Sequence, residues 1–387
     1  MAQPDPFLPP ALFSRWLKLR LQILDAIARG AAVSLAAWIG SLLCIYYYFH
    51  LVTPISLFAN LAVVPIAYFV LALSLLSLIA APVSAVLSTI FNNANWLLSR
   101  AVLALVHLFA AIPNGHFYLP EPGAAYTPVS ITILDEGTGA AAHIRANGYD
   151  WLIDSGGARS YERTLKAYLH SHGVNRLEGL ILTHGDSQHL GGAGGVIGDF
   201  APREIYDNPL GVRSTLQREI AERFNPRFLV RDGALALGRD VEAQVLYPPP
   251  HARISSADDA PIVVKMTIDN STTVLFESDA GEESEHALVN SGDDLRSDIL
   301  IKGQHHTGGS GTPEFLEAVQ PRIIIATSRE SPVAENITDE WANEVGRRGI
   351  KLFRQDKTGA VEITFQSNGE YQARSYLSGE IFRSSNR

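Results

Sequence analysis

Three side chains that can bind a metal ion, His184, Asp186 and His189, lie within six residues of one another. They follow a short apolar run, residues 180–182, which has the composition of a buried strand. A strand that ends at Thr183 would deliver the three side chains into a turn. Imidazole and carboxylate together suit zinc or another first-row divalent ion. The alternative is a polar loop whose histidines cap a helix or face water.

Two later apolar runs also end in residues of this kind. Residues 273–276 lead to Asp279, and a further run leads to His305 and His306. A sheet holds ligands rigidly when they lie at the ends of several of its strands. Taken singly, Asp279 also suits a turn or a helix cap. Together with the earlier loop, these positions favour one metal site built from several strand ends.

The spacing of apolar residues from residue 129 onward indicates an α/β or sheet-sandwich domain. Short apolar runs alternate there with turns rich in Gly and Asp. The predicted strands are residues 129–134, 142–146, 151–153, 180–182, 228–230, 243–247, 262–268, 273–276, 299–302, 323–326, 351–354 and 360–365. The predicted helices are residues 162–170, 214–224, 313–319 and 339–348.

The first third of the chain is typical of a membrane protein. Residues 31–49 carry no charge, and nineteen helical residues are about enough to cross a hydrocarbon core of roughly 30 Å. Residues 55–90 are also uncharged, and a further apolar stretch follows a predicted polar turn at residues 92–95. We therefore expect a cytoplasmic lead-in at 1–30, transmembrane helices at 31–113, a linker at 114–128, the sandwich domain at 129–375 and a tail at 376–387.

Charge divides the chain in the same way. Residues 1–120 carry five Lys or Arg and two Asp, a net charge of +3, so the remainder carries −12. The basic residues precede the first apolar stretch, which places the N-terminus in the cytoplasm, and three crossings would place the sandwich domain outside. An acidic domain is a poor generic nucleic-acid binder. The single cysteine, Cys44, excludes a disulfide framework and a cysteine-type zinc site.

Several motifs resemble known families. Residues 152–157, Leu-Ile-Asp-Ser-Gly-Gly, resemble the "LIDTG" element of the metallo-β-lactamase fold, and residues 183–189 resemble its His-x-His/Asp-x-Asp-His motif. Residues 134–139 are similar to the "LDVGQGD" motif of the competence DNA-internalisation protein family (ComEC), and residues 302–306 to its "K-x-x-HHGS". Residues 349–361 are similar to that family's C-terminal motif. The resemblance implies transmembrane α-helices followed by an α/β metallo-β-lactamase-like αββα sandwich.

The resemblance also implies a function: a membrane-anchored protein for DNA uptake whose lactamase-like domain is a metal-dependent nuclease on incoming DNA. A metal-activated hydroxide would attack the phosphodiester, with one or two zinc or manganese ions. The implied roles are His184 and Asp186 on the first metal, His189 and one of His305 or His306 on the second, Asp279 as the bridge, and Asp186 and Lys302 as catalytic residues. The implied partners are DNA, the membrane and other competence or channel components. The implied location is the bacterial inner (cytoplasmic) membrane, with several crossings and the sandwich domain on the outer side.

The chain departs from the family pattern at informative positions. Gln188 replaces the second aspartate of the metal motif, which removes a negative charge from the second metal position, and Ala140 replaces the acid of "GQGD". The late "GHP" histidine, the oligonucleotide-binding-type domain and many upstream helices of the family have no counterpart here, so we expect a fragment or a reduced relative. Two alternatives follow. One is a degenerate domain with a structural or DNA-guiding role, and the other is a hydrolase of a small phosphodiester or ester.

Overall fold

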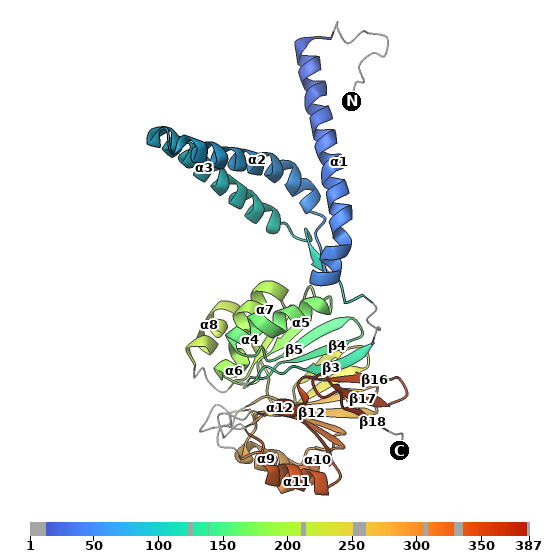
Figure 1. Cartoon of the computed structure of the whole chain (residues 1–387). Coiled ribbons are helices and arrows are strands. Elements are labelled where there is room, and N and C mark those ends of the chain that lie inside the picture. Colours follow the sequence, from blue (N-terminus) through green and yellow to red (C-terminus); the bar gives the residue numbers. More distant parts are fainter. Residues whose placement is uncertain are drawn as a thin grey trace. The chain divides into compact units, whose positions relative to one another are not determined.

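The computed structural model describes residues 13–122, 127–137, 139–209, 214–250, 261–304, 309–328 and 336–384 (Figure 1). The chain divides into two compact units. One comprises Met1–Pro122 and Ser171–Gly173, and the other comprises Gly123–His170 and Val174–Arg387.

The first unit consists of three long helices: α1 (Arg15–Phe49), α2 (Ser56–Ala80) and α3 (Ala85–Ala110). The hydroxyl of Ser14 caps α1 by accepting from Leu17 N at 3.2 Å. After α1, the short strand β1 (Leu51–Val52) pairs with β2 (Phe117–Tyr118). Among the described residues, α1 and α2 are long and apolar enough to cross a membrane. The basic lead-in and the first apolar stretch therefore form one continuous helix.

Helices α2 and α3 form a hairpin that turns around Pro82 (Figure 1). The prediction of a polar turn at residues 92–95 was wrong, because these asparagines lie inside α3. Asn95 donates to Ser74 Oγ at 2.8 Å, and the hydroxyls of Ser77 and Ser88 lie 3.0 Å apart. Small polar side chains can be accommodated in an apolar hairpin when they hydrogen-bond across the interface.

The second unit is built on two sheets. The first has nine strands in the order β18-β17-β16-β3-β4-β5-β6-β7-β8, and the second has seven in the order β15-β14-β13-β12-β11-β10-β9. The strands are β3 (Val129–Ile133), β4 (Ala142–Ala146), β5 (Tyr149–Ile153), β6 (Gly179–Ile181), β7 (Glu204–Asp207), β8 (Arg227–Phe228), β9 (Ala234–Gly238), β10 (Val241–Tyr247), β11 (Val263–Ile268), β12 (Thr272–Ser278), β13 (Ile299–Lys302), β14 (Ile323–Ala326), β15 (Lys351–Arg354), β16 (Val361–Phe365), β17 (Tyr371–Ser375) and β18 (Ile381–Arg383). Strands β5 to β8 run parallel to one another, as do β12 to β15.

Helices cover the outer face of each sheet (Figure 1). The first group is α4 (Ala158–Ser160), the π-helical turn η2 (Tyr161–Leu165), α5 (Lys166–Ser171), α6 (Ser187–Leu190), α7 (Ala193–Phe200) and α8 (Thr215–Phe224). The second group is α9 (Glu282–Val289), α10 (Pro313–Val319) and α11 (Asp339–Arg347), and the short α12 (Gln355–Thr358) connects β15 to β16.

Three apolar clusters match this layering. One lies between the two sheets and takes side chains from both, including Ile144, Met266 and Ile325. The second lies between the nine-stranded sheet and its helices, and the third between the seven-stranded sheet and its helices. Four layers with three cores are an αββα sandwich, which confirms the predicted fold class. Strand β18 pairs with β17 and lies in the segment that we predicted as a tail.

Candidate metal centre

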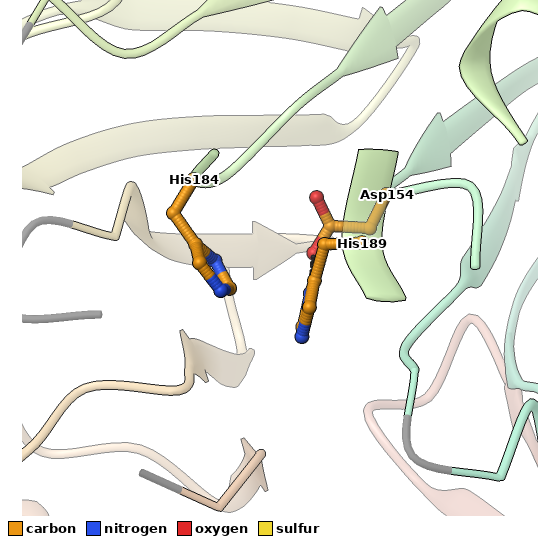
Figure 2. A group of neighbouring side chains, drawn as sticks. All are labelled: Asp154, His184 and His189. Carbon is orange, nitrogen blue, oxygen red and sulfur yellow. Dashed lines mark hydrogen bonds and ion pairs between the residues drawn. The ribbon is translucent and has the colours of Figure 1, made fainter. Parts of the chain in front are cut away.

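The ends of three strands contribute to one buried cluster. Asp154 follows β5, His184 follows β6 after two residues, and Asp279 follows β12. His189 lies on α6, the short helix that begins directly after the His184 loop. Figure 2 shows Asp154, His184 and His189, whose potential ligand atoms all lie within 4.8 Å of one another. The two imidazole ring centres are 4.1 Å apart.

The hydroxyl of Thr183 connects the groups behind this cluster. It donates to Asp154 Oδ2 at 2.7 Å, while the backbone N–H of Thr183 donates to Asp154 Oδ1 at 2.8 Å. A hydroxyl has one proton and two lone pairs, so the same oxygen can accept from His184 Nδ1, which is 3.0 Å away. It can also accept from Ser278 Oγ at 2.8 Å, which ties the end of β12 to the end of β6.

These bonds fix how the two imidazoles are presented. His189 Nδ1 lies 2.8 Å from Asp154 Oδ2, so both histidines have Nδ1 engaged by the protein. We therefore assign the proton of each ring to Nδ1, which leaves Nε2 as the potential ligand atom. Both Nε2 atoms face the same carboxylate oxygen: Asp279 Oδ2 lies 2.9 Å from His189 and 3.8 Å from His184.

Charge is concentrated on His189 and Asp279. Burial lowers the pKa of His189. The nearby carboxylates of Asp279 and Asp154 raise it by more than burial lowers it, so the pKa lies well above its usual range. Burial raises the pKa of Asp279, yet His189 and His184 lower it by more. In the absence of a metal ion, His189 is therefore an imidazolium between two carboxylates. A cation bound at its Nε2 would replace that proton.

The donor set fits a divalent metal ion. The Nε2 atoms of His184 and His189 both lie within 3.8 Å of Asp279 Oδ2, and Asp154 orients the His189 ring from behind. A histidine ligand held by a carboxylate at its other nitrogen is the usual arrangement at such sites. The structure thus brings His184, His189 and Asp279 close to one another.

Asp186 and Gln188 lie at the edge of this cluster. Asp186 caps α6, where its Oδ1 accepts from Gln188 N at 2.9 Å, and its side chain is half-buried. Gln188 is exposed on the same short helix. Neither belongs to the group whose ligand atoms converge in the part of the chain that the structure describes.

Lys302 is buried rather than solvated. Its Nζ donates to Gly303 O at 2.7 Å and to Ser310 Oγ at 2.8 Å, and it lies 5.4 Å from the centre of the Trp341 ring. These contacts join the two sides of the segment that carries His305 and His306. The two histidines themselves lie outside the described residues.

Sequence reasoning missed three residues that organise the site: Asp154, Thr183 and Ser278. A signal for Asp154 was present, because it ends an apolar strand in the same way as Asp279. Thr183 and Ser278 carried no such signal, since a hydroxyl at a strand end is common. The two hydroxyls come into contact only because the ends of β6 and β12 meet in the folded domain.

Two family models match adjoining parts of this chain. Residues 7–134 match the family "Competence protein", and residues 134–262 match the "Metallo-beta-lactamase superfamily". The chain joins a competence domain to a metallo-β-lactamase domain, the organisation of the ComEC family. The strand order and the buried His/Asp cluster agree with the second match.

Curated relatives match most of the chain. It is 27% identical over 302 residues to Competence protein ComA of Neisseria gonorrhoeae, which covers 78% of this chain and 40% of that protein. It is 23% identical over 237 residues to ComE operon protein 3 of Bacillus subtilis, covering 56% of this chain and 30% of the relative. The chain therefore spans less than half the length of these relatives.

The chain is also similar to solved structures. The metallo-beta-lactamase fold protein YhfI of Bacillus subtilis is 13% identical, with a TM-score of 0.40, over 59% of this chain and 96% of that one. A diphosphatase of the PhnP family is 14% identical, with a TM-score of 0.37, over 60% of this chain and 97% of that one.

Proposed function

We propose that this chain is a membrane-anchored competence protein for DNA uptake, and that its metallo-β-lactamase domain is a metal-dependent nuclease acting on incoming DNA. The observation that carries this proposal is the convergence of His184 Nε2, His189 Nε2 and Asp279 Oδ2 in a chain that also matches the competence family. The proposed location is the inner membrane, with the lactamase domain on its outer side.

The chain's own residues have distinct roles in this proposal. His184, His189 and Asp279 hold the ion, while Asp154 and Thr183 keep both rings in the tautomer that presents Nε2. A divalent ion bound there would lower the pKa of a water molecule and so supply hydroxide at neutral pH. Lys302 bonds to Gly303 O and Ser310 Oγ, which lie before and after His305 and His306 in the sequence, and its proposed role is catalytic. Asp186, which caps α6, lies at the edge of the site and is a proposed catalytic carboxylate.

The test uses the full chain purified in detergent. We expect at least one zinc or manganese ion per chain, and cleavage of single-stranded DNA that is lost in His184→Ala and His189→Ala. The control is His286→Ala, because His286 is half-exposed on α9 and lies outside the cluster. A chain that carries a full complement of metal but leaves DNA intact would contradict the nuclease.

A second candidate is a degenerate, non-catalytic domain with a structural or DNA-guiding role, and Gln188 favours it. A neutral amide at this position weakens binding of a hard cation relative to a carboxylate. Less than one ion per chain would support this candidate. If Gln188→Asp raises both the metal content and the cleavage rate, then the amide at this position limits metal binding and activity in the natural chain.

A third candidate is a hydrolase of a small phosphodiester or ester. The net charge of −12 on residues 121–387 favours a small substrate over DNA, because phosphate contacts along a strand need Lys and Arg. Cleavage of bis(p-nitrophenyl) phosphate without cleavage of DNA, both with manganese present, would select this candidate.

A further inference from the structure

Strand β9, at one edge of the seven-stranded sheet, lacks the features that usually protect an edge strand. It reads Ala-Leu-Ala-Leu-Gly, without charge or proline. The other edge strands of the two large sheets are β8, β15 and β18, and each carries at least one Arg or Lys. In the part of the chain that the structure describes, no strand pairs with the outer side of β9. An uncharged edge of this kind is a template for pairing with another extended segment.

The hydrogen bonds before β9 show which of its backbone groups point outward. Val245 of β10 donates from its N–H to Gly233 O at 2.8 Å, so its backbone faces this side of the sheet. Antiparallel partners alternate between bonded and non-bonded pairs, and Ala243, two residues before Val245, lies opposite Leu235. Leu235 therefore bonds to β10. The N–H and C=O groups of its two neighbours in β9 point away from β10, toward the open side.

A cavity of about 490 Å³ lies beside this edge and is lined by all five residues of β9. Three aromatic residues, Tyr149, Trp151 and Tyr206, also line it. The indole of Trp151 donates to Leu237 O at 2.7 Å, which closes the edge at that residue. The open stretch is therefore residues 234–236. Side chains on one face of a strand added there would enter the cavity.

The charged residues of this cavity favour a basic ligand. Glu178, Glu204 and one arginine, Arg203, line it. Arg203 contacts Glu178 at 3.1 Å, and Arg227 contacts Glu204 at 2.8 Å, but both arginines are more than half exposed. Exposed pairs of this kind are weak, so a bound cation can share the two carboxylates. The aromatic residues beside them can also hold a Lys or Arg side chain over their rings. The net charge of −12 on residues 121–387 attracts a basic segment from a distance.

We propose that β9 is a docking site for an extended basic segment of a partner protein, which adds a strand to the sheet and places a Lys or Arg side chain in the cavity. Backbone hydrogen bonds to the open edge would supply affinity, and the aromatic and acidic lining would select the side chain. Glu178 directly precedes β6 and Glu204 begins β7, whereas His184 follows the end of β6. The docking site is thus separate from the metal centre and does not depend on its activity.

The test measures binding of a fluorescein-labelled Lys-Val-Lys-Val-Lys-Val peptide to the full chain in detergent, by fluorescence anisotropy. We expect Ala236→Pro to weaken binding at least tenfold, because Ala236 adjoins Leu235 and its N–H points outward. Proline is tolerated on the open side of an edge strand, so the thermal midpoint should be retained. Ala236→Ser keeps the N–H and is the matched control. Equal binding to a folded Ala236→Pro chain and to the natural chain would overturn the proposal.

Two peptide controls leave the protein unchanged. The same peptide N-methylated at every residue keeps its charge but cannot donate backbone hydrogen bonds, and it should bind at least tenfold more weakly. Equal binding of this peptide would refute strand addition. A Glu-Val-Glu-Val-Glu-Val peptide should also bind at least tenfold more weakly, and equal binding would refute selection of a basic side chain.

Sedimentation velocity tests whether a second copy of the chain occupies the edge instead. The natural chain and Ala236→Pro should sediment as the same species, because the proposed occupant is a different protein. A natural dimer that becomes monomeric in Ala236→Pro would assign β9 to self-association and refute a site for a partner segment.

Discussion

At the scale of single residues, Thr183 connects three groups of the metal centre. Its hydroxyl contacts Asp154, His184 and Ser278, each at 3.0 Å or less. Groups that orient a metal ligand from behind typically contribute 10- to 100-fold to metal affinity. We therefore expect Thr183→Val, which keeps the shape but removes the hydroxyl, to weaken zinc binding by about that factor. Isothermal titration calorimetry would measure the change.

The matched control for this prediction is Thr183→Ser. Serine keeps the hydroxyl and should retain most of the zinc affinity, although it has less steric restriction than threonine. Equal zinc affinities in Thr183→Val and the natural chain would mean that the histidines need no orientation by the Thr183 hydroxyl. The backbone bond from Thr183 N to Asp154 would then suffice.

Asp207 gives the folded domain a specific pH dependence. Burial raises its pKa to about 6, opposed by hydrogen bonds from Asn208 and Gln217. Because the folded state binds this proton more tightly than the unfolded chain, the free energy of unfolding falls as pH rises from about 4 to 6. A shift of two units corresponds to roughly 3 kcal/mol at most. Asp207→Asn should remove this dependence and raise the thermal midpoint at pH 7.5.

Calorimetric unfolding at pH 5 and pH 7.5 would check the prediction for Asp207. The natural chain should lose stability between these values through this group, and the variant should lose less. A larger pH dependence in Asp207→Asn than in the natural chain would contradict the assigned direction of the pKa shift.

At the scale of elements, β6, the strand that leads to His184, packs closely against its neighbour β5. A β-carbon on Gly179 would lie 2.1 Å from Cζ3 of Trp151, its partner on β5. The indole of Trp151 donates to Leu237 O at 2.7 Å, so it cannot easily move aside. Overpacking of this kind costs about 1–3 kcal/mol. We expect Gly179→Ala to lower the free energy of unfolding by at least this amount and to weaken metal binding at His184.

Gly194→Ala is the matched control for Gly179→Ala. Gly194 lies in α7, and a β-carbon there would meet no atom within 4 Å. Alanine is favoured over glycine in a helix by about 1 kcal/mol, so this variant should be as stable as the natural chain or more stable. Chemical denaturation in urea would compare the two. Equal loss of stability in both variants would rule out the clash with Trp151 as the cause.

The apolar runs predicted most strands because each buried strand needs a continuous or alternating apolar pattern. Residues 180–182, for example, anticipated β6 within one residue. The pattern could not predict that Asn95 lies inside a helix, because its partner, Ser74, is twenty-one residues away. It also could not predict that Lys302 is buried, since Ser310 and Trp341 reach it only in the folded domain. Long-range partners decide the positions of polar side chains, and local composition does not contain them.

At the scale of the whole molecule, the number of membrane crossings decides where the lactamase domain works. The basic residues of α1 lie in its first half, which favours an N-terminus in the cytoplasm. Two crossings would return the chain to the cytoplasm. Helix α3 packs along α2 and is 26 residues long, so a crossing by α2 brings α3 back across as well. We therefore expect three crossings and a domain outside the cytoplasm.

Cys44 makes this prediction simple to test, because it is the only cysteine in the chain. In a Cys44→Ser background, a single new cysteine would be introduced by Glu222→Cys on α8 or by Lys18→Cys at the start of α1. A membrane-impermeant maleimide added to intact spheroplasts should label the first variant and not the second. Both should react after permeabilisation. Labelling of position 18 alone in intact spheroplasts would reverse the topology, and labelling of neither would place both ends in the cytoplasm, as two crossings require.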